Sequence, residues 1–318
     1  MRQATRRRII IDADPGIDDA VAILLALAAP EELEVLGVVA VAGNLPLTLT
    51  ERNARRVCEL GGRTDIAVYA GCGRPLLRPL ATAERIHGET ARDRLLLPEP
   101  TMAPRPQHGV DFLIDTLRSE AAGTVTLCAL GPLTNIAMAL VKTPDIAERI
   151  AELVVMGGTC RELGNVTPAA EFNIYVDPHA AAIVLDSGIP ITMIPLDVTH
   201  QVLTTPERLT ALRGLGNRCG SAVAALLGAF ERRRRRGGFG ARGRALHDPC
   251  VIGYLLRPAL FGGREVNVAI ETESPLTLGM TVADWWGVTG RKANLRLMNT
   301  VDAGGFYDLM TERLACLP

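Results

Sequence analysis

The stretch IIIDADPGIDDAVAILLALA, residues 9–28, places four aspartates between two apolar runs. They are Asp12, Asp14, Asp18 and Asp19. The first run is typical of a buried strand and the second of a helix. Carboxylates this close repel one another, and burying them without partners costs several kcal/mol or more. We therefore expect a bound cation, whose charge would offset that cost.

Strand-like and helix-like patterns alternate along most of the chain. The strand-like runs are continuous in Val, Ile and Leu, which is typical of strands covered on both faces. They fall at residues 33–43, 124–132, 152–158 and 190–197, and helices are expected at 18–29, 47–60, 133–142 and 177–188. This alternation predicts a single α/β domain over residues 1–318, with a mainly parallel open sheet and helices on both faces, as in Rossmann-like folds.

Polar stretches follow several of the predicted strands directly. The aspartates follow residues 8–11, Asn44 follows VVAVAG, residues 131–135 follow TLCAL, and Gly157 ends another run. Ligands of open α/β sheets bind outside the carboxyl ends of the strands. The sequence therefore predicts one site, built at that edge from distant parts of the chain.

The composition is that of an ordinary soluble globular protein. Of 318 residues, 48% are hydrophobic and 22% charged, and the net charge is −1. That charge gives no reason to expect a nucleic-acid or membrane partner. The seven cysteines include no C-x-x-C pair, so we expect them to be reduced packing residues. With no signal-peptide core and no run near ~20 apolar residues, we expect a cytoplasmic protein.

Three other interpretations of the aspartates explain less. Helix capping accounts for one or two of them, not for four. An EF-hand loop counted from Asp12 would need Glu at its twelfth position, where the chain has Ile23. An aspartyl-phosphate phosphatase needs a lysine for the phosphoryl group, and neither Lys142 nor Lys292 follows a strand suitably. A site for a hard cation such as Ca²⁺ or Mg²⁺ explains the cluster best.

The motif DADPGIDDA resembles the D-x-D-P-G-x-D-D-A signature of the inosine-uridine-preferring nucleoside hydrolases. Further stretches of that family's pattern follow in order and span nearly the whole chain. They are VAGN with Asn44, HGET with His87, LGPLTNIA with Leu130, GNVTPAAEFNIYVDPHAA with Asn165, Glu171, Phe172 and Asn173, and HDP with His247 and Asp248.

The resemblance implies a Ca²⁺ site and a reaction. The cation would be bound by Asp14, Asp19, Asp248 and the backbone carbonyl of Leu130, with water and substrate hydroxyls completing its shell. The reaction implied is hydrolysis of the N-glycosidic bond of ribonucleosides, with a metal-bound water as the nucleophile. Asp14 would be the general base for that water, and His247 the general acid toward the departing base.

The resemblance also implies which residues bind the substrate. Hydrogen bonds to the ribose would come from Asp18, Asn44, Asn165, Glu171 and Asn173. Phe172, His87 and His247 would complete the substrate site, the two histidines near the base. A role in nucleoside catabolism and salvage, and a homodimer or homotetramer, are implied in the same way.

The chain departs from the family pattern in places that bear on the substrate. After HGE it reads TARDRLLLP instead of a Gly-rich turn, and Leu278 replaces a frequent basic residue. The run Arg232–Arg236 is a solvated helix end or, by resemblance, part of a lid in which Phe230 or Phe239 stacks on the base. Purine or pyrimidine preference, a modified nucleoside as substrate, and a non-catalytic nucleoside- or ribose-binding protein all stay open.

Overall fold

The computed structural model describes residues 6–83, 95, 97–234 and 244–318. Its strands are β1 (Arg7–Ala13), β2 (Leu33–Ala40), β3 (Val68–Ala70), β4 (Val125–Ala129), β5 (Ile150–Met156), β6 (Ile191–Ile194), β7 (Leu203–Thr204), β8 (Arg244–Ala245), β9 (Phe261–Ile270), β10 (Thr281–Asp284) and β11 (Leu295–Val301). Its α-helices are α1 (Ile17–Leu27), α2 (Leu47–Leu60), α4 (Gly109–Ser119), α5 (Thr134–Lys142), α6 (Phe172–Val176), α7 (Pro178–Leu185), α8 (Leu196–Thr199), α9 (Pro206–Arg213), α10 (Arg218–Arg234), α11 (Pro249–Leu256) and α12 (Ala303–Leu314), with 3₁₀ helices η2 (Pro144–Arg149) and η3 (Pro258–Leu260).

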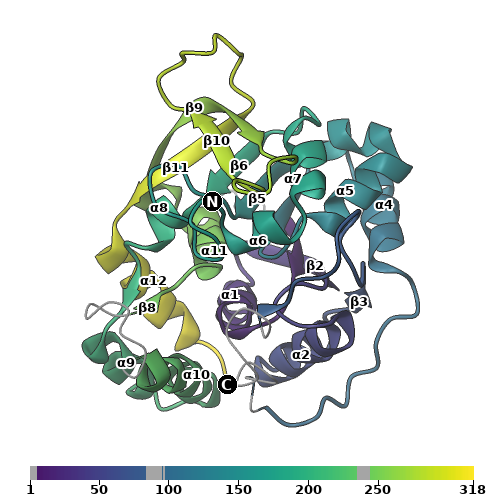
Figure 1. The fold of residues 1–318 in the computed structure, drawn as a ribbon. Helices are drawn as coiled ribbons and strands as arrows, with labels where there is room; N and C mark the ends of the chain where they lie inside the picture. Colours follow the sequence, from purple (N-terminus) through teal and green to yellow (C-terminus); the bar gives the residue numbers. More distant parts are fainter. Residues whose placement is uncertain (1–5, 84–94, 96, 235–243) are drawn as a thin grey trace, which may run out of the picture.

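One large sheet organises the molecule (Figure 1). In the described ranges its order is β10-β9-β11-β6-β5-β4-β1-β2-β3, and β7 pairs with β8 in a small separate ribbon. Every pairing from β11 to β3 is parallel, whereas β9 runs antiparallel to both β10 and β11. The mainly parallel open sheet expected from the sequence is confirmed, with an antiparallel edge that the sequence patterns did not predict.

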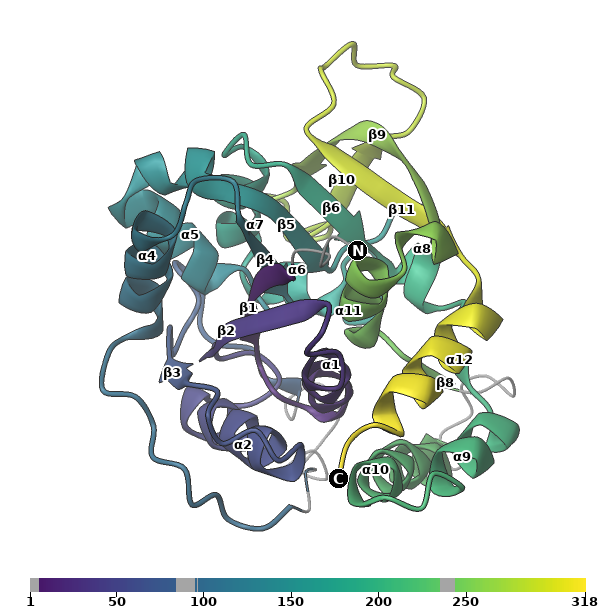
Figure 2. The ribbon, with the colours of Figure 1, turned by 180° about the vertical axis from the view of Figure 1, so that it is seen from behind.

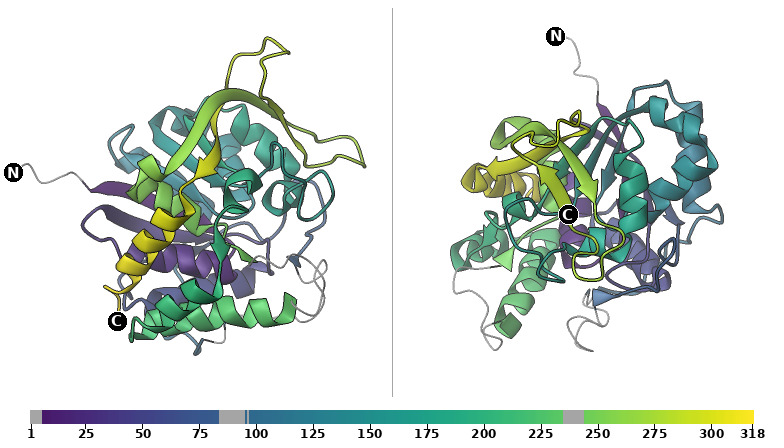
Figure 3. Two further views of the ribbon diagram at one scale, coloured as in Figure 1. Left: turned by 90° about the vertical axis from the view of Figure 1, so that its left-hand side faces the viewer. Right: turned by 45° about the horizontal axis from the view of Figure 1, so that its top comes forward.

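Helices cover both faces of the sheet, and the alternation along β1 shows how. Ile9 and Ile11 pack in the core shared with α1, α2, α10, α11 and α12. Ile10 points the other way, into the core shared with α4, α5 and α7. Because successive strand residues face opposite sides, a strand buried on both faces needs a continuous apolar run. Figures 2 and 3 show the two helical layers on either side of the strands.

The element boundaries agree closely with the sequence patterns in most places. Helix α2 has the bounds that were expected. Strand β2 ends at Ala40, three residues before Gly43, because the chain then turns and Ala42 donates its N–H to the carbonyl of Cys72 (3.0 Å). All seven cysteines are free, and four of them are buried. No helix in the described part of the chain is long and apolar enough to cross a membrane.

The parallel register brings the carboxyl ends of the central strands to one edge. Asp12 of β1 pairs with Ala129 of β4, and Ala129 in turn pairs with Val155 of β5. The polar stretches that follow β1, β2, β4 and β5 therefore start side by side. The polar stretches that the sequence placed after these strands therefore lie together at one edge of the sheet.

Candidate functional site

The turn between β1 and α1 holds the aspartate cluster against the end of the sheet. Asp14 and Asp19 have no exposed surface, and Asp18 is 6% exposed. Asp19 closes its own turn, since its two carboxylate oxygens accept the backbone N–H groups of Asp14 (3.1 Å) and Gly16 (3.0 Å). Helix capping thus explains Asp19 in part and leaves the other carboxylates without an explanation.

Asp14 lies at the centre of the cluster with one oxygen unpartnered. Its Oδ2 accepts the backbone N–H of Asn44, whereas its buried Oδ1 has no hydrogen-bond partner among the described residues. Glycines close in from two sides. A Cβ built on Gly43 would lie 2.1 Å from Oδ2, and one on Gly131 would lie 2.7 Å from Oδ1. Gly43 and Gly131 thus leave space for the Asp14 carboxylate that any larger residue at these two positions would fill.

This packing predicts that Gly43→Ala removes activity more than stability. The added methyl group must displace the Asp14 carboxylate, so we expect kcat to fall about 100-fold, the cost of a displacement near 1 Å in a catalytic group. Gly73→Ala is the matched control, because its Cβ would meet nothing closer than Leu47 at 3.7 Å. Steady-state kinetics of both variants provide the test, and equal activities would contradict this role for Gly43.

Asp248 brings a third carboxylate to Asp14 and Asp19 from the start of α11. Burial, followed by repulsion from Asp19 and Asp18, raises the pKa of the Asp248 carboxyl well above its ordinary value. Burial and then repulsion from Asp19 do the same to the pKa of Asp14. Burial and mutual repulsion therefore disfavour the charged forms of Asp14 and Asp248.

The donors gathered here suit a hard cation. They are all oxygens, and the unpartnered Oδ1 of Asp14 is the kind of atom that such an ion takes up. No group of three or more His, Cys, Asp or Glu side chains within the described ranges is arranged to hold a metal ion by itself. The predicted set relies in addition on the carbonyl of Leu130, which accepts the side-chain amide of Asn173 (2.8 Å).

Three of the five predicted ribose-binding residues, Asn165, Glu171 and Asn173, lie in or near α6 and have structural partners there. Glu171 is buried and caps α6 by accepting the N–H groups of Asn173 (3.0 Å) and Ile174 (3.3 Å). Burial raises the pKa of its carboxyl to about 7. Asn165 is exposed, and its Oδ1 accepts the N–H of the partly exposed Phe172 (2.9 Å).

Asp18 is joined to a distant segment by an ion pair. Its Oδ1 lies 2.9 Å from Nη2 of Arg244 in β8, and both side chains are largely buried. Its Oδ2 accepts the backbone N–H of His247 (3.1 Å). The aspartate turn thereby positions the segment that carries His247 and Asp248.

His247 is partly buried beside these carboxylates. Its Nδ1 lies 2.8 Å from the hydroxyl of Thr199, the last residue of α8. Burial lowers the pKa of the imidazole to about 4, and the attraction of Asp18 only partly offsets this. The ring is therefore neutral near pH 7, where it can donate one hydrogen bond and accept another.

The sequence patterns missed two residues of this site, Arg244 and Thr199, which contact predicted site residues. Asn135, from the polar stretch 131–135, donates to the buried Asp12 (2.8 Å). Thr199 follows the strand-like run 190–197 almost directly, so the rule on strand ends could have found it. Asn44 lies at the cluster as predicted, while His87, Phe239 and the side chain of Phe230 fall outside what the structure describes.

Comparisons with known proteins agree with this geometry. A family model described as inosine-uridine preferring nucleoside hydrolase matches residues 9–308. An uncharacterised protein of Schizosaccharomyces pombe is 51% identical over 98% of this chain and 100% of its own. A pyrimidine-specific ribonucleoside hydrolase of Escherichia coli (strain K12) is 47% identical over 96% of this chain and 97% of its own.

Solved structures resemble the fold over nearly its full length. A plant nucleoside hydrolase superposes with a TM-score of 0.88 at 31% identity, covering 97% of this chain and 99% of that one. A purine-preferring ribonucleoside hydrolase of Gardnerella vaginalis gives 0.89 at 30% identity, with 97% and 98% covered.

Proposed function

The chain belongs to the inosine-uridine preferring nucleoside hydrolase family and is an enzyme acting on N-glycosyl compounds, and from this premise we propose that it hydrolyses ribonucleosides in a Ca²⁺-dependent reaction. The products are the free base and ribose. The observation that carries the proposal is the unpartnered, buried Oδ1 of Asp14 amid carboxylates of raised pKa. Such an arrangement costs stability and is retained where a cation and a reaction use it.

Asp14 is the proposed general base. Asp14, Asp19, Asp248 and the Leu130 carbonyl would hold Ca²⁺, which would supply a Lewis-acid charge that makes water more acidic and holds the ribose hydroxyls. Asp14 takes one proton from the attacking water while the oxygen of that water bonds to C1′ of the ribose. The C1′–N bond breaks, and its electron pair goes to the nitrogen of the base. The buried carboxylates stabilise the positive charge that develops on the sugar.

His247 acts on the departing base. Because its ring is neutral near pH 7, it donates a hydrogen bond to the negative charge growing on the base. The base nitrogen then takes up a proton from water, and Asp14 releases the proton that it removed, so the products are the neutral base and ribose. Asp18 accepts a hydrogen bond from the backbone N–H of His247 and forms an ion pair with Arg244, and these two contacts position His247. The remaining proposed substrate contacts are Asp18, Asn44, His87, Asn165, Glu171, Phe172 and Asn173.

The chain is 47% identical to the pyrimidine-specific relative and 30% identical to the purine-preferring one. This difference favours pyrimidine ribonucleosides as substrates. The test is ribose release from uridine, cytidine, inosine and adenosine with Ca²⁺ present. We expect uridine and cytidine to be cleaved fastest. Binding of these nucleosides without release of ribose would instead favour the non-catalytic alternative, and cleavage of a modified nucleoside alone would redefine the substrate.

We also propose a homodimer or homotetramer. Large apolar side chains are exposed in and around β10, with Leu276 at 85%, Trp286 at 78% and Val288 at 84% exposed. Side chains of this kind are typical of surfaces that another chain covers. Light scattering measures the mass in solution, and a monomer at micromolar concentration would contradict the proposal.

A further inference from the structure

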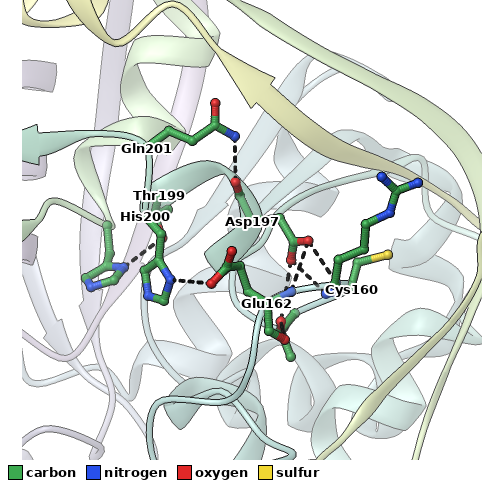
Figure 4. Close-up of polar contacts among 9 residues, drawn as sticks. Cys160, Glu162, Asp197, Thr199, His200 and Gln201 are labelled. Carbon is green, nitrogen blue, oxygen red and sulfur yellow. Dashed lines mark hydrogen bonds and ion pairs between the residues drawn. The ribbon is translucent and has the colours of Figure 1, made fainter. Parts of the chain in front are cut away.

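Helix α8 contacts His247 through its last residue, Thr199, and hydrogen bonds join the helix to two other segments of the chain. The carboxylate of Asp197 accepts the backbone N–H groups of Cys160 (2.7 Å) and Arg161 (2.8 Å), which belong to the loop after β5. Gln201 donates its amide to the carbonyls of Asp197 (2.6 Å) and Asn299 (2.9 Å). Figure 4 shows these contacts on the two sides of Asp197. The end of α8 is therefore a rigid platform.

Two consecutive side chains of this platform face His247. The hydroxyl of Thr199, a fully buried residue, lies 2.8 Å from Nδ1 of His247. The ring of His200 meets that of His247 edge-on, with the ring centroids 6.0 Å apart. His200 is in turn fixed by its Nδ1, which lies 3.2 Å from Oε2 of Glu162 (Figure 4). His247 is thus contacted by the Thr199 hydroxyl at one ring nitrogen and by the ring of His200.

We propose that Thr199 is a positioning residue for the reaction: it donates its O–H to Nδ1 of His247, which places the ring proton on Nε2. An imidazole has two nitrogens, and a neutral one carries a single N–H. With Nδ1 occupied as an acceptor, Nε2–H is left to donate to the departing base. This inference rests on the proposed function, in which His247 acts on that base.

The tautomer matters because the two forms do opposite things at the base. The Nε2–H form donates to the nitrogen that receives the electron pair of the broken C1′–N bond. The Nδ1–H form would present a lone pair to that same nitrogen and repel it. A buried partner that selects the tautomer of a catalytic histidine is a known requirement of such sites. Thr199 meets it with a hydroxyl in place of the more usual carboxylate.

The test compares Thr199→Val, which keeps the shape and loses the hydroxyl, with Thr199→Ser, which keeps the hydroxyl. Two substrates are used with each: uridine, and 4-nitrophenyl β-ribofuranoside, whose leaving group departs as a stable anion. We expect Thr199→Val to lower kcat on uridine about 10- to 100-fold. Cleavage of the nitrophenyl riboside should fall far less, because its leaving group needs no donor. Thr199→Ser should restore most of the uridine activity.

Thr210→Val is the matched control, because Thr210 is exposed on α9 and its hydroxyl donates to the carbonyl of Pro206 (2.9 Å). An equal loss on both substrates in Thr199→Val, or no loss on either, would overturn the positioning role. Failure of the wild type to cleave either substrate would overturn the proposed function instead. In that case ¹⁵N spectra of the imidazoles still decide the inference: an Nδ1–H tautomer of His247 in the wild type would refute it.

Discussion

Replacing Asp14 by Asn is expected to lower kcat for ribonucleosides at least about 1,000-fold, which is within the range for removing a general base that also holds the metal. The same change should make the metal-free protein more stable. Asp14 is fully buried, and burial together with repulsion from Asp19 raises the pKa of its carboxyl. An amide of the same shape carries no charge, so the repulsion disappears. Activity and stability therefore move in opposite directions.

The experiment pairs single-turnover kinetics with thermal unfolding of chelator-treated protein at pH 8. Asp145→Asn is the control, since Asp145 forms an exposed ion pair with Arg118 and lies in η2, away from the site. That variant should match the wild type in both measurements. An Asp14→Asn enzyme with near-normal kcat, or one that is less stable than the wild type without metal, would exclude the central role assigned to Asp14.

Without calcium, the protein should lose stability as the pH rises from 6.5 to 8. Burial is the largest cause that raises the pKa of Asp19 to about 6, and those of Asp12 and Glu171 to about 7. A carboxyl whose pKa is higher in the folded than in the unfolded protein binds more protons when folded. Its contribution to stability is full at low pH and is lost as the pH rises through the folded value.

His247 changes the stability of the folded protein in the opposite direction, and it does so at lower pH. Burial lowers its pKa from 6.5 to about 4, so its contribution to stability grows between those values. For this reason the fall caused by the carboxyls is best measured above pH 6.5. We expect the melting temperature of the metal-free protein to drop by roughly 5 °C between pH 6.5 and 8. A melting temperature that rises across this interval would show that the carboxyls are not strained by burial.

Added calcium should reverse this loss. The ion binds ionised carboxylates in the folded state only, and at 100 times its dissociation constant it stabilises a protein by about 2.7 kcal/mol. Its effect on the melting temperature should therefore be larger at pH 8 than at pH 6.5. A calcium effect that is absent at both pH values would contradict the proposed ligand set of Asp14, Asp19 and Asp248.

The central part of this fold could be predicted because its sequence patterns are local. Residues 9–28 contain a strand, a turn and a helix, and each is identified by its own apolar pattern. Strand β9 and its antiparallel pairing with β10 and β11 were not predicted, since β9 has a mixed burial pattern and pairs with residues further along the chain. The single domain over residues 1–318 stays a prediction.

The position of the site could be predicted, and the direction in which its side chains point could not. Asp18 and His247 lie 229 positions apart, and no local pattern indicates their hydrogen bond. Polar residues also serve the fold before they serve a substrate. Glu171 caps α6 and Asn173 donates to the carbonyls of Leu130 and Met156. A sequence motif lists such residues together and does not separate these two uses.

The most direct test of the account is uridine cleavage by enzyme stripped with a chelator and then titrated with Ca²⁺. We expect the stripped enzyme to release almost no ribose and the activity to return as the Ca²⁺ site fills. Full activity of the metal-free enzyme would contradict the cation site at Asp14, Asp19 and Asp248. Failure of a folded, calcium-loaded enzyme to cleave uridine or any other ribonucleoside would contradict the proposed reaction itself.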